Sequence, residues 1–184
     1  KMVLPRLGGT PAVWSVAMVF FQTVLLAGYG YAHVLSRYFR LHTAVIIHLC
    51  VLGVALFALP MALPEGWRRP PADGEALWLI GLFTVSVGLP FFAVSANGPL
   101  LQAWFARSGH VHAKDPYFLY GASNVGSFAS LILYIILIEP LFELGQQSIL
   151  WTGGFVLLAA SIATCGYLAW RLASENGSSH VEGE

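Results

Sequence analysis

Long runs of apolar residues, separated by short polar or charged segments, dominate the chain. A helix of about 20 apolar residues is long enough to cross a bilayer core about 30 Å thick. Runs of about that length cover residues 12–35, 43–61, 76–95 with an extension to 106, 117–138 and 148–171. They show no alternation of apolar and polar positions, the pattern typical of barrel strands. The pattern therefore predicts an all-α, polytopic membrane helix bundle with five transmembrane helices within residues 12–172.

The third run is longer than one membrane crossing requires, and it contains two prolines. Pro90 and Pro99 each remove a backbone donor, which tends to kink a helix. We expect one span near residues 76–95. A bend at SANGP (residues 95–99) and an amphipathic end near the membrane interface would follow it.

Basic residues predict which loops face the cytoplasm, because cytoplasmic loops are enriched in Lys and Arg. One set of loops contains Arg37, Arg40, Arg107, Lys114 and Arg171, and the other contains Lys1, Arg6, Arg68 and Arg69. The small excess in the first set predicts a non-cytoplasmic loop over residues 1–11 and a cytoplasmic polar tail over 173–184, expected to lack a fixed structure. Tryptophans near the predicted span ends fit an interfacial aromatic belt. They are Trp14, Trp67, Trp78, Trp104, Trp151 and Trp170.

Composition agrees with a membrane protein, because 57% of the residues are hydrophobic and only 10% are charged. Soluble domains carry about 25% charged residues, and so few charges cannot cover a water-facing surface. The net charge of zero does not indicate a nucleic-acid partner, so the predicted partners are membrane lipids and other transmembrane helices or subunits. Cys50 and Cys165 both lie inside apolar runs and form no disulfide framework.

Motifs that carry catalytic chemistry are missing from the sequence. It has no glycine-rich nucleotide loop after a strand, no HExxH motif and no cysteine pair at metal-binding spacing. His110 and His112 form the only local metal-like pattern, and two imidazoles fall short of the three or four ligands of ordinary metal sites. The sequence therefore predicts a protein that is not an enzyme and that has no metal site.

Polar residues inside the predicted spans are the main candidates for a site, because polar groups are costly in a bilayer. Gln22 and Tyr29 lie seven residues apart in the first run, and Asn97 and Gln102 lie in the third. His48, early in the second run, could bind a proton or serve as an axial ligand of a haem or pigment. The alternative is a hydrogen bond to a neighbouring helix or a lipid headgroup, so no cofactor is predicted.

The fourth run combines small residues with an asparagine. Asp115 is a candidate N-cap of its helix and Pro116 a candidate first residue. Small residues then recur every four positions, which lets a second helix approach closely. They are Ala122, Gly126 and Ser130 in one row, and Ser123 and Ser127 in another. Asn124 lies among them, either to hydrogen-bond to the neighbouring helix or to line a solute path.

Residues 6–33, 88–106 and 115–140, with QQSILW at 146–151, resemble the N-terminal membrane region of bacterial spermidine-synthase-like membrane proteins. These proteins are described as a fused major-facilitator/spermidine-synthase family. The resemblance implies half of a major-facilitator-like unit in a bacterial inner membrane, with this chain supplying helices two to six and a first helix upstream. Ile135 stands where the resemblance leads us to expect a proline, which predicts a less bent fourth span.

The resemblance also limits the function, because the aminopropyltransferase domain of longer family members has no counterpart in this chain. We expect a non-catalytic membrane scaffold or accessory subunit of a larger complex, such as an energy-converting, respiratory or photosynthetic assembly. One alternative is a half-transporter for a small polar or cationic solute, with Gln22, Asn97, Gln102 and Asn124 lining its path. The other is a membrane anchor for a polyamine aminopropyltransferase-like enzyme.

Overall fold

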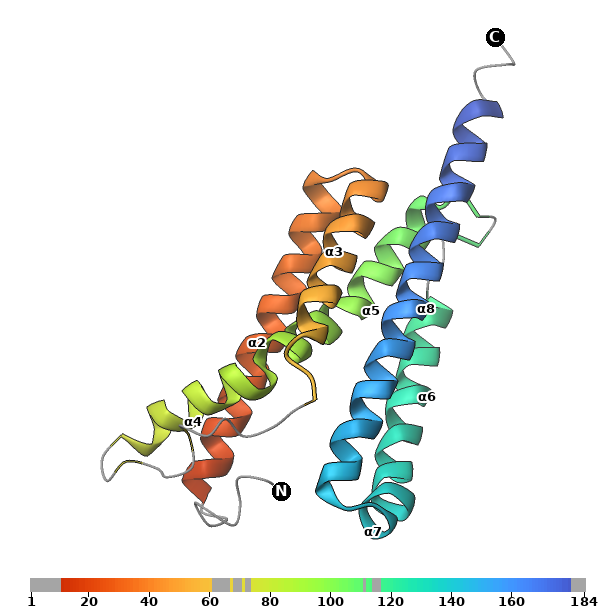
Figure 1. Cartoon of the computed structure of the whole chain (residues 1–184). Helices are drawn as coiled ribbons and strands as arrows, with labels where there is room; N and C mark the ends of the chain where they lie inside the picture. The colour runs from red at the N-terminus through yellow and green to blue at the C-terminus, as the bar shows by residue number, and fades with distance from the viewer. Residues whose placement is uncertain are drawn as a thin grey trace.

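The structure is a computed structural model that describes residues 11–60, 67, 71, 74–110, 112–113 and 117–179, without the side chains of 176–179. All regular elements in these ranges are helices (Figure 1). They are α2 (Pro11–Tyr38), α3 (Leu41–Leu56), α4 (Glu75–Phe83), η2 (Thr84–Gly88), α5 (Leu89–Arg107), α6 (Tyr117–Leu133), η3 (Tyr134–Ile138), α7 (Glu139–Leu141) and α8 (Leu144–Ser179). The predicted all-α class is confirmed.

Four helical stretches are long and apolar enough to cross a membrane, namely Pro11–Tyr38, Glu75–Arg107, Tyr117–Leu141 and Leu144–Glu175. The second predicted span, 43–61, is shorter than expected, because α3 ends at Leu56 and has 16 residues. At about 1.5 Å per residue, α3 is about 24 Å long. The described part of the chain thus has four apolar helices of spanning length and one shorter apolar helix, the organisation of a multi-pass membrane protein.

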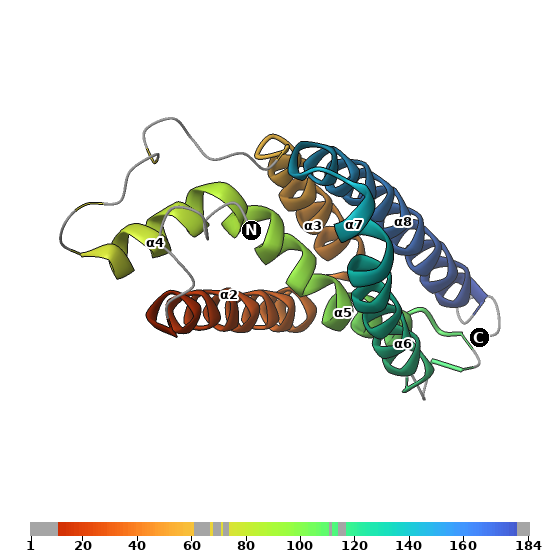
Figure 2. The same ribbon diagram turned by 90° about the horizontal axis from the view of Figure 1, so that it is seen from below.

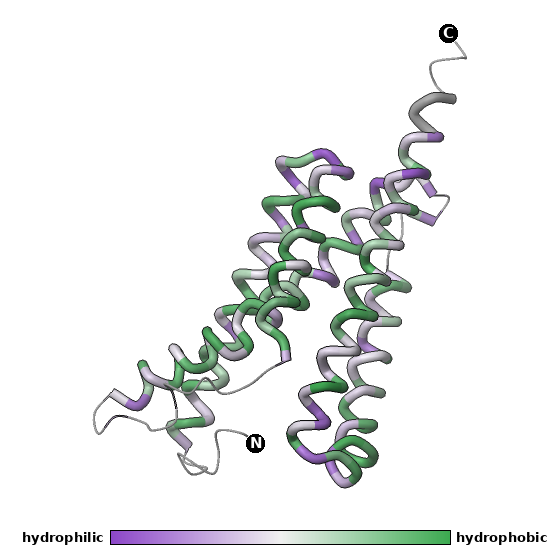
Figure 3. The backbone as a smooth tube through the Cα atoms, in the orientation of Figure 1, coloured by the Kyte–Doolittle hydropathy of each residue, from purple (hydrophilic) through white to green (hydrophobic). Residues whose placement is uncertain are grey.

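Hydrophilic positions gather toward the ends of the helices, and apolar positions fill their middles (Figure 3). The α2–α3 connection, the α5–α6 connection and the C-terminal part of α8 lie at one end of the bundle (Figure 1). Arg107, in the last turn of α5, donates a hydrogen bond from Nη1 to the carbonyl oxygen of Phe39 at 3.2 Å. This contact ties two of the predicted cytoplasmic loops to each other.

The third span continues as helix through SANGP, where the sequence suggests a bend. The departure from α-helical hydrogen bonding lies upstream, in the π-helical segment η2, which ends two residues before Pro90. The second π-helical segment, η3, likewise ends two residues before Pro140 and contains Ile135. A proline has no N–H to donate to the carbonyl four residues earlier, and the wider turn is the local response.

The other boundaries also differ from the predicted ones. Helix α8 continues to Ser179, so residues 173–179 of the predicted tail are helical. An ion pair between Arg171 and Glu175 at 2.9 Å, one turn apart, supports this extension. The loop at 1–10, the tail beyond 179 and the Asp115–Pro116 helix start lie outside the described residues.

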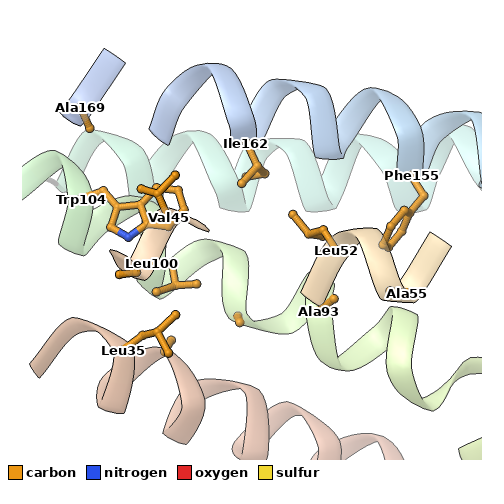
Figure 4. Close-up of a cluster of buried hydrophobic side chains, with 13 residues drawn as sticks. Leu35, Val45, Leu52, Ala55, Ala93, Leu100, Trp104, Phe155, Ile162 and Ala169 are labelled. Carbon is orange, nitrogen blue, oxygen red and sulfur yellow. The ribbon is translucent and has the colours of Figure 1, made fainter. Parts of the chain in front are cut away.

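Four helices build the core, as the close-up in Figure 4 shows. The larger buried side chains are Leu35 from α2, Val45 and Leu52 from α3, Leu100 and Trp104 from α5, and Phe155 and Ile162 from α8. Helix α6 contributes no buried residue. Figures 1 and 2 show it on the outside of the bundle, on the side away from α2.

Close packing of α2 on α5 depends on Gly28, which is buried. A Cβ at this position would clash with Ser95 Oγ and would lie 3.2 Å from the carbonyl oxygen of Phe92. The backbone carbonyl cannot rotate away as a side chain can. A glycine is therefore required where the two helices cross.

We predict that Gly28→Leu lowers the free energy of unfolding by about 1–3 kcal/mol, the usual cost of overpacking. Gly30→Leu is the matched control, because a Cβ at Gly30 meets no atom within 4 Å. It should leave stability unchanged or raise it slightly, since glycine is a poor helix former. Thermal unfolding of both variants in the same detergent measures the difference, and equal melting temperatures would contradict the role of Gly28.

Candidate functional site

His48 lies at the centre of the bundle and has 0% of its surface exposed. Its place follows from the spacing of the buried residues on α3, which recur at 44, 45, 48, 52 and 55. These positions form one face of a helix. The face turned toward α5 and α8 is apolar except for the imidazole, which must find its hydrogen-bond partners inside the protein.

Two side chains from other helices meet the imidazole. Asn97 of α5 lies 2.7 Å from it, measured from Oδ1 to His48 Nε2, and Asn97 is only 7% exposed. The hydroxyl of Tyr31, on α2, lies 3.5 Å from His48 Nδ1. Three helices that are distant in the sequence therefore share one polar cluster, which we call the His48 cluster: Tyr31, His48, Asn97 and Trp104.

The hydrogen-bond geometry assigns the imidazole tautomer. An amide oxygen can only accept, so Nε2 of His48 carries the proton and donates it to Asn97. Nδ1 is then the acceptor, and the Tyr31 hydroxyl donates to it. A single neutral tautomer thus satisfies both nitrogens of the buried ring.

Aromatic rings enclose the cluster. Trp104 of α5, 1% exposed, meets His48 edge to face with ring centroids 6.1 Å apart, and Tyr31 lies 5.9 Å from His48 on the same measure. Gly166 of α8 lets that helix close over Trp104, because a Cβ there would lie 3.3 Å from the indole ring and closer still to Val45. The indole of Trp104 thus packs inside the bundle instead of lying on its outer surface.

The other polar residues predicted for the spans lie outside the His48 cluster. Gln22 and Tyr29 are exposed on α2, and Gln102 is half-buried on α5. Asn124 is exposed on α6. Of the predicted polar set, the structure brings only His48 and Asn97 together.

All of the predicted packing residues on α6 are exposed in this chain. They are Ala122, Ser123, Asn124, Gly126, Ser127 and Ser130. Helix α6 meets the rest of the bundle at its two ends. Phe118 contacts Phe105 of α5 with ring centroids 5.4 Å apart, and the Tyr134 hydroxyl in η3 donates to Gln147 Oε1 of α8 at 3.3 Å. The small-residue rows between these ends are exposed throughout in the part of the chain that the structure describes.

His110 and His112 lie in the α5–α6 connection, with ring centroids 5.6 Å apart. The backbone N–H of His112 donates to His110 Nδ1 at 3.2 Å. Both rings line an open pocket of about 460 Å³ together with Phe105, Tyr117 and Phe118. Among the described residues, no group of three or more His, Cys, Asp or Glu side chains is placed to hold a metal ion.

A cofactor at His48 would compete with contacts that already exist. A haem or pigment metal needs a ring nitrogen with a free lone pair. Nε2 is engaged by Asn97 at 2.7 Å and Nδ1 faces the Tyr31 hydroxyl. Axial ligation would therefore require one of these two side chains to move away.

Sequence reasoning missed Tyr31 and Trp104 as members of the cluster. Both fit ordinary interpretations, Tyr31 as one aromatic residue among many in α2 and Trp104 as an interfacial anchor. A heptad spacing was available as a signal, since Trp104 follows Asn97 by seven residues and so lies on the same face of α5. Comparison with known proteins adds no assignment, because no family model, curated protein or solved structure matches the chain.

We predict that Asn97→Leu and His48→Leu each lower the free energy of unfolding by about 1–3 kcal/mol, because each leaves a buried polar partner unpaired. The double variant should cost clearly less than the sum, since it removes both partners at once. Chemical or thermal unfolding of the four proteins measures the coupling. Gln22→Ala, at an exposed position, should change stability by less than about 0.5 kcal/mol. Additive effects of the two substitutions would show that the hydrogen bond is not stabilising.

Proposed function

We propose that this chain is a non-catalytic membrane scaffold or accessory subunit, and that α6 packs against transmembrane helices of another subunit. The larger complex would be an energy-converting, respiratory or photosynthetic assembly in a bacterial inner membrane. The single observation that supports this proposal is the exposure of α6. Of its 17 residues, only Leu119 is even partly buried.

Lipid alone is a poor environment for the residues that α6 exposes. Asn124 makes no hydrogen bond within the described part of the chain, and an amide in hydrocarbon is costly. Ser127 and Ser130 lie on the same helix, where the Ser130 hydroxyl donates to the carbonyl oxygen of Ser127 at 2.9 Å. A neighbouring helix would offer Asn124 a partner, and the small residues would let that helix approach closely.

The glycines of α6 offer a matched test of this proposal. A Cβ added at Gly121 or at Gly126 meets no atom within 4 Å in the chain. The two positions are five residues apart and thus about 140° apart around the helix. Only Gly126 lies on the row with Ala122 and Ser130. A leucine at either site therefore leaves the isolated chain undisturbed and differs only in what it presents to a partner.

We predict that Gly126→Leu lowers recovery of the co-purifying complex at least tenfold, while Gly121→Leu leaves recovery unchanged. Affinity purification from native membranes, followed by quantitative mass spectrometry, measures both. Melting temperatures of the isolated variants should be equal, which serves as the control for folding. Equal recovery with both variants would overturn the assignment of this face.

Asn124→Ala separates assembly from transport. On the scaffold proposal, complex recovery falls several-fold and uptake of a labelled small cation by membrane vesicles does not change. Loss of uptake with unchanged complex recovery would favour the half-transporter instead. Release of an enzyme activity from the membrane, with neither of these effects, would favour the anchor.

We further propose that α3 crosses the membrane with the four longer helices, so that five spans correspond to helices two to six of a major-facilitator-like half. In support, successive helices run in opposite directions along the bundle, α2 up, α3 down, α4–α5 up, α6 down and α8 up (Figure 1). Helix α3 is also flanked by α2, α5 and α8, which can shield the ends of this short apolar helix from lipid. A short span of this kind is tolerated where neighbouring helices cover its ends.

The proposed orientation places the N-terminal side outside and the C-terminal side in the cytoplasm. It predicts that Glu75→Cys, at the first residue of α4, reacts with a membrane-impermeant maleimide in intact spheroplasts. Arg40→Cys, between α2 and α3, should react only after permeabilisation. Cys50 and Cys165, both exposed on helices, are first replaced by alanine. The reverse labelling pattern would invert the orientation.

A further inference from the structure

The His48 cluster leaves two buried donors without acceptors. Asn97 Nδ2 and Trp104 Nε1 are both enclosed, and neither has a hydrogen-bond partner within the described residues. Both side chains flank the same imidazole, Asn97 through its 2.7 Å hydrogen bond and Trp104 through its ring contact. They lie seven residues apart on one face of α5.

We propose that the buried donors Asn97 Nδ2 and Trp104 Nε1 form a binding site for a water-sized, neutral hydrogen-bond acceptor, occupied by internal water in the folded protein. Buried polar groups in proteins are paired with protein atoms or with ordered water as a rule. The bilayer makes this requirement stricter, because lipid chains offer no hydrogen bonds. The indole can only donate, so its partner must be an acceptor.

The surroundings exclude larger or charged ligands. The buried polar residues of the described chain are His48, Asn97 and Ser108, so no buried side chain with a permanent charge could balance an ion at this site. The two donor atoms are enclosed by protein, which leaves no route for an organic ligand of many atoms. Water satisfies both conditions, since it is small, neutral and able to accept two hydrogen bonds.

Proton NMR of the full-length chain in lipid nanodiscs tests the site. The protein is labelled with ¹⁵N-tryptophan, and the six indole signals are resolved. The Trp104 signal is assigned by its loss in Trp104→Phe, or by elimination through substitution of the other five tryptophans if that variant does not fold. We expect a cross-peak between the Trp104 indole proton and water, although this side chain is 1% exposed.

Two variants make the result specific. Tyr31→Phe should keep the cross-peak, which excludes an exchanging Tyr31 hydroxyl proton as its source. Asn97→Leu should abolish it or weaken it at least fivefold, because the site then loses its amide and gains an apolar side chain. Gln22→Leu, at an exposed position on α2, should leave it unchanged.

The proposal is overturned if the Trp104 indole shows cross-peaks only to protein or lipid protons in the wild type. It is overturned equally if the water cross-peak disappears in Tyr31→Phe. Neither result depends on complex assembly through α6, so the site stands or falls separately from the proposed scaffold function.

Discussion

Hydrocarbon cannot form hydrogen bonds, so every polar group at bilayer depth must find a partner inside protein. For the backbone, the helix meets this requirement locally, and the described regular structure is accordingly all helical. A serine hydroxyl can meet it within its own helix, as Ser130 does, but an imidazole or an amide needs a neighbouring helix. His48 shows how, because its two nitrogens reach Asn97 on α5 and Tyr31 on α2. The rotation of α3 about its own axis is thereby tied to two other helices.

The hydrocarbon of the bilayer also changes which forces hold helices together. Between helices in lipid, apolar burial gives little net driving force, and association depends on close packing and hydrogen bonds. Gly28 and Gly166 are two places where such close packing occurs, one at the crossing of α2 and α5 and one against Val45 and Trp104. Gly121 and Gly126 of α6 have the same chemistry and no neighbour. Glycines thus allow close packing at Gly28 and Gly166, whereas no described residue packs against Gly121 or Gly126.

The sequence predicts local features of this fold better than contacts between its helices. Apolar runs identify α2, the third span, α6 and α8, because helix formation in a membrane is decided by neighbouring residues. The π-helical segments end two residues before Pro90 and Pro140, yet Pro99 lies in regular helix, so proline alone does not locate a distortion. The pairing of His48 with Asn97 joins residues 49 positions apart, and it depends on helix rotations that no local pattern encodes. Both residues were predicted as candidates, but as separate ones.

Burial separates two kinds of intramembrane polar residue that look alike in the sequence. Asn97 and Asn124 are both amides amid small residues, and either could serve packing or a solute path. Asn97 lies inside the bundle and already binds an imidazole of its own chain, so its role is internal. Asn124 is exposed on α6, where the described residues offer it no hydrogen-bond partner. On the proposed scaffold function, an amide in that position takes its partner from another polypeptide, and α6, rather than the buried cluster, is then the surface through which the protein contacts other subunits.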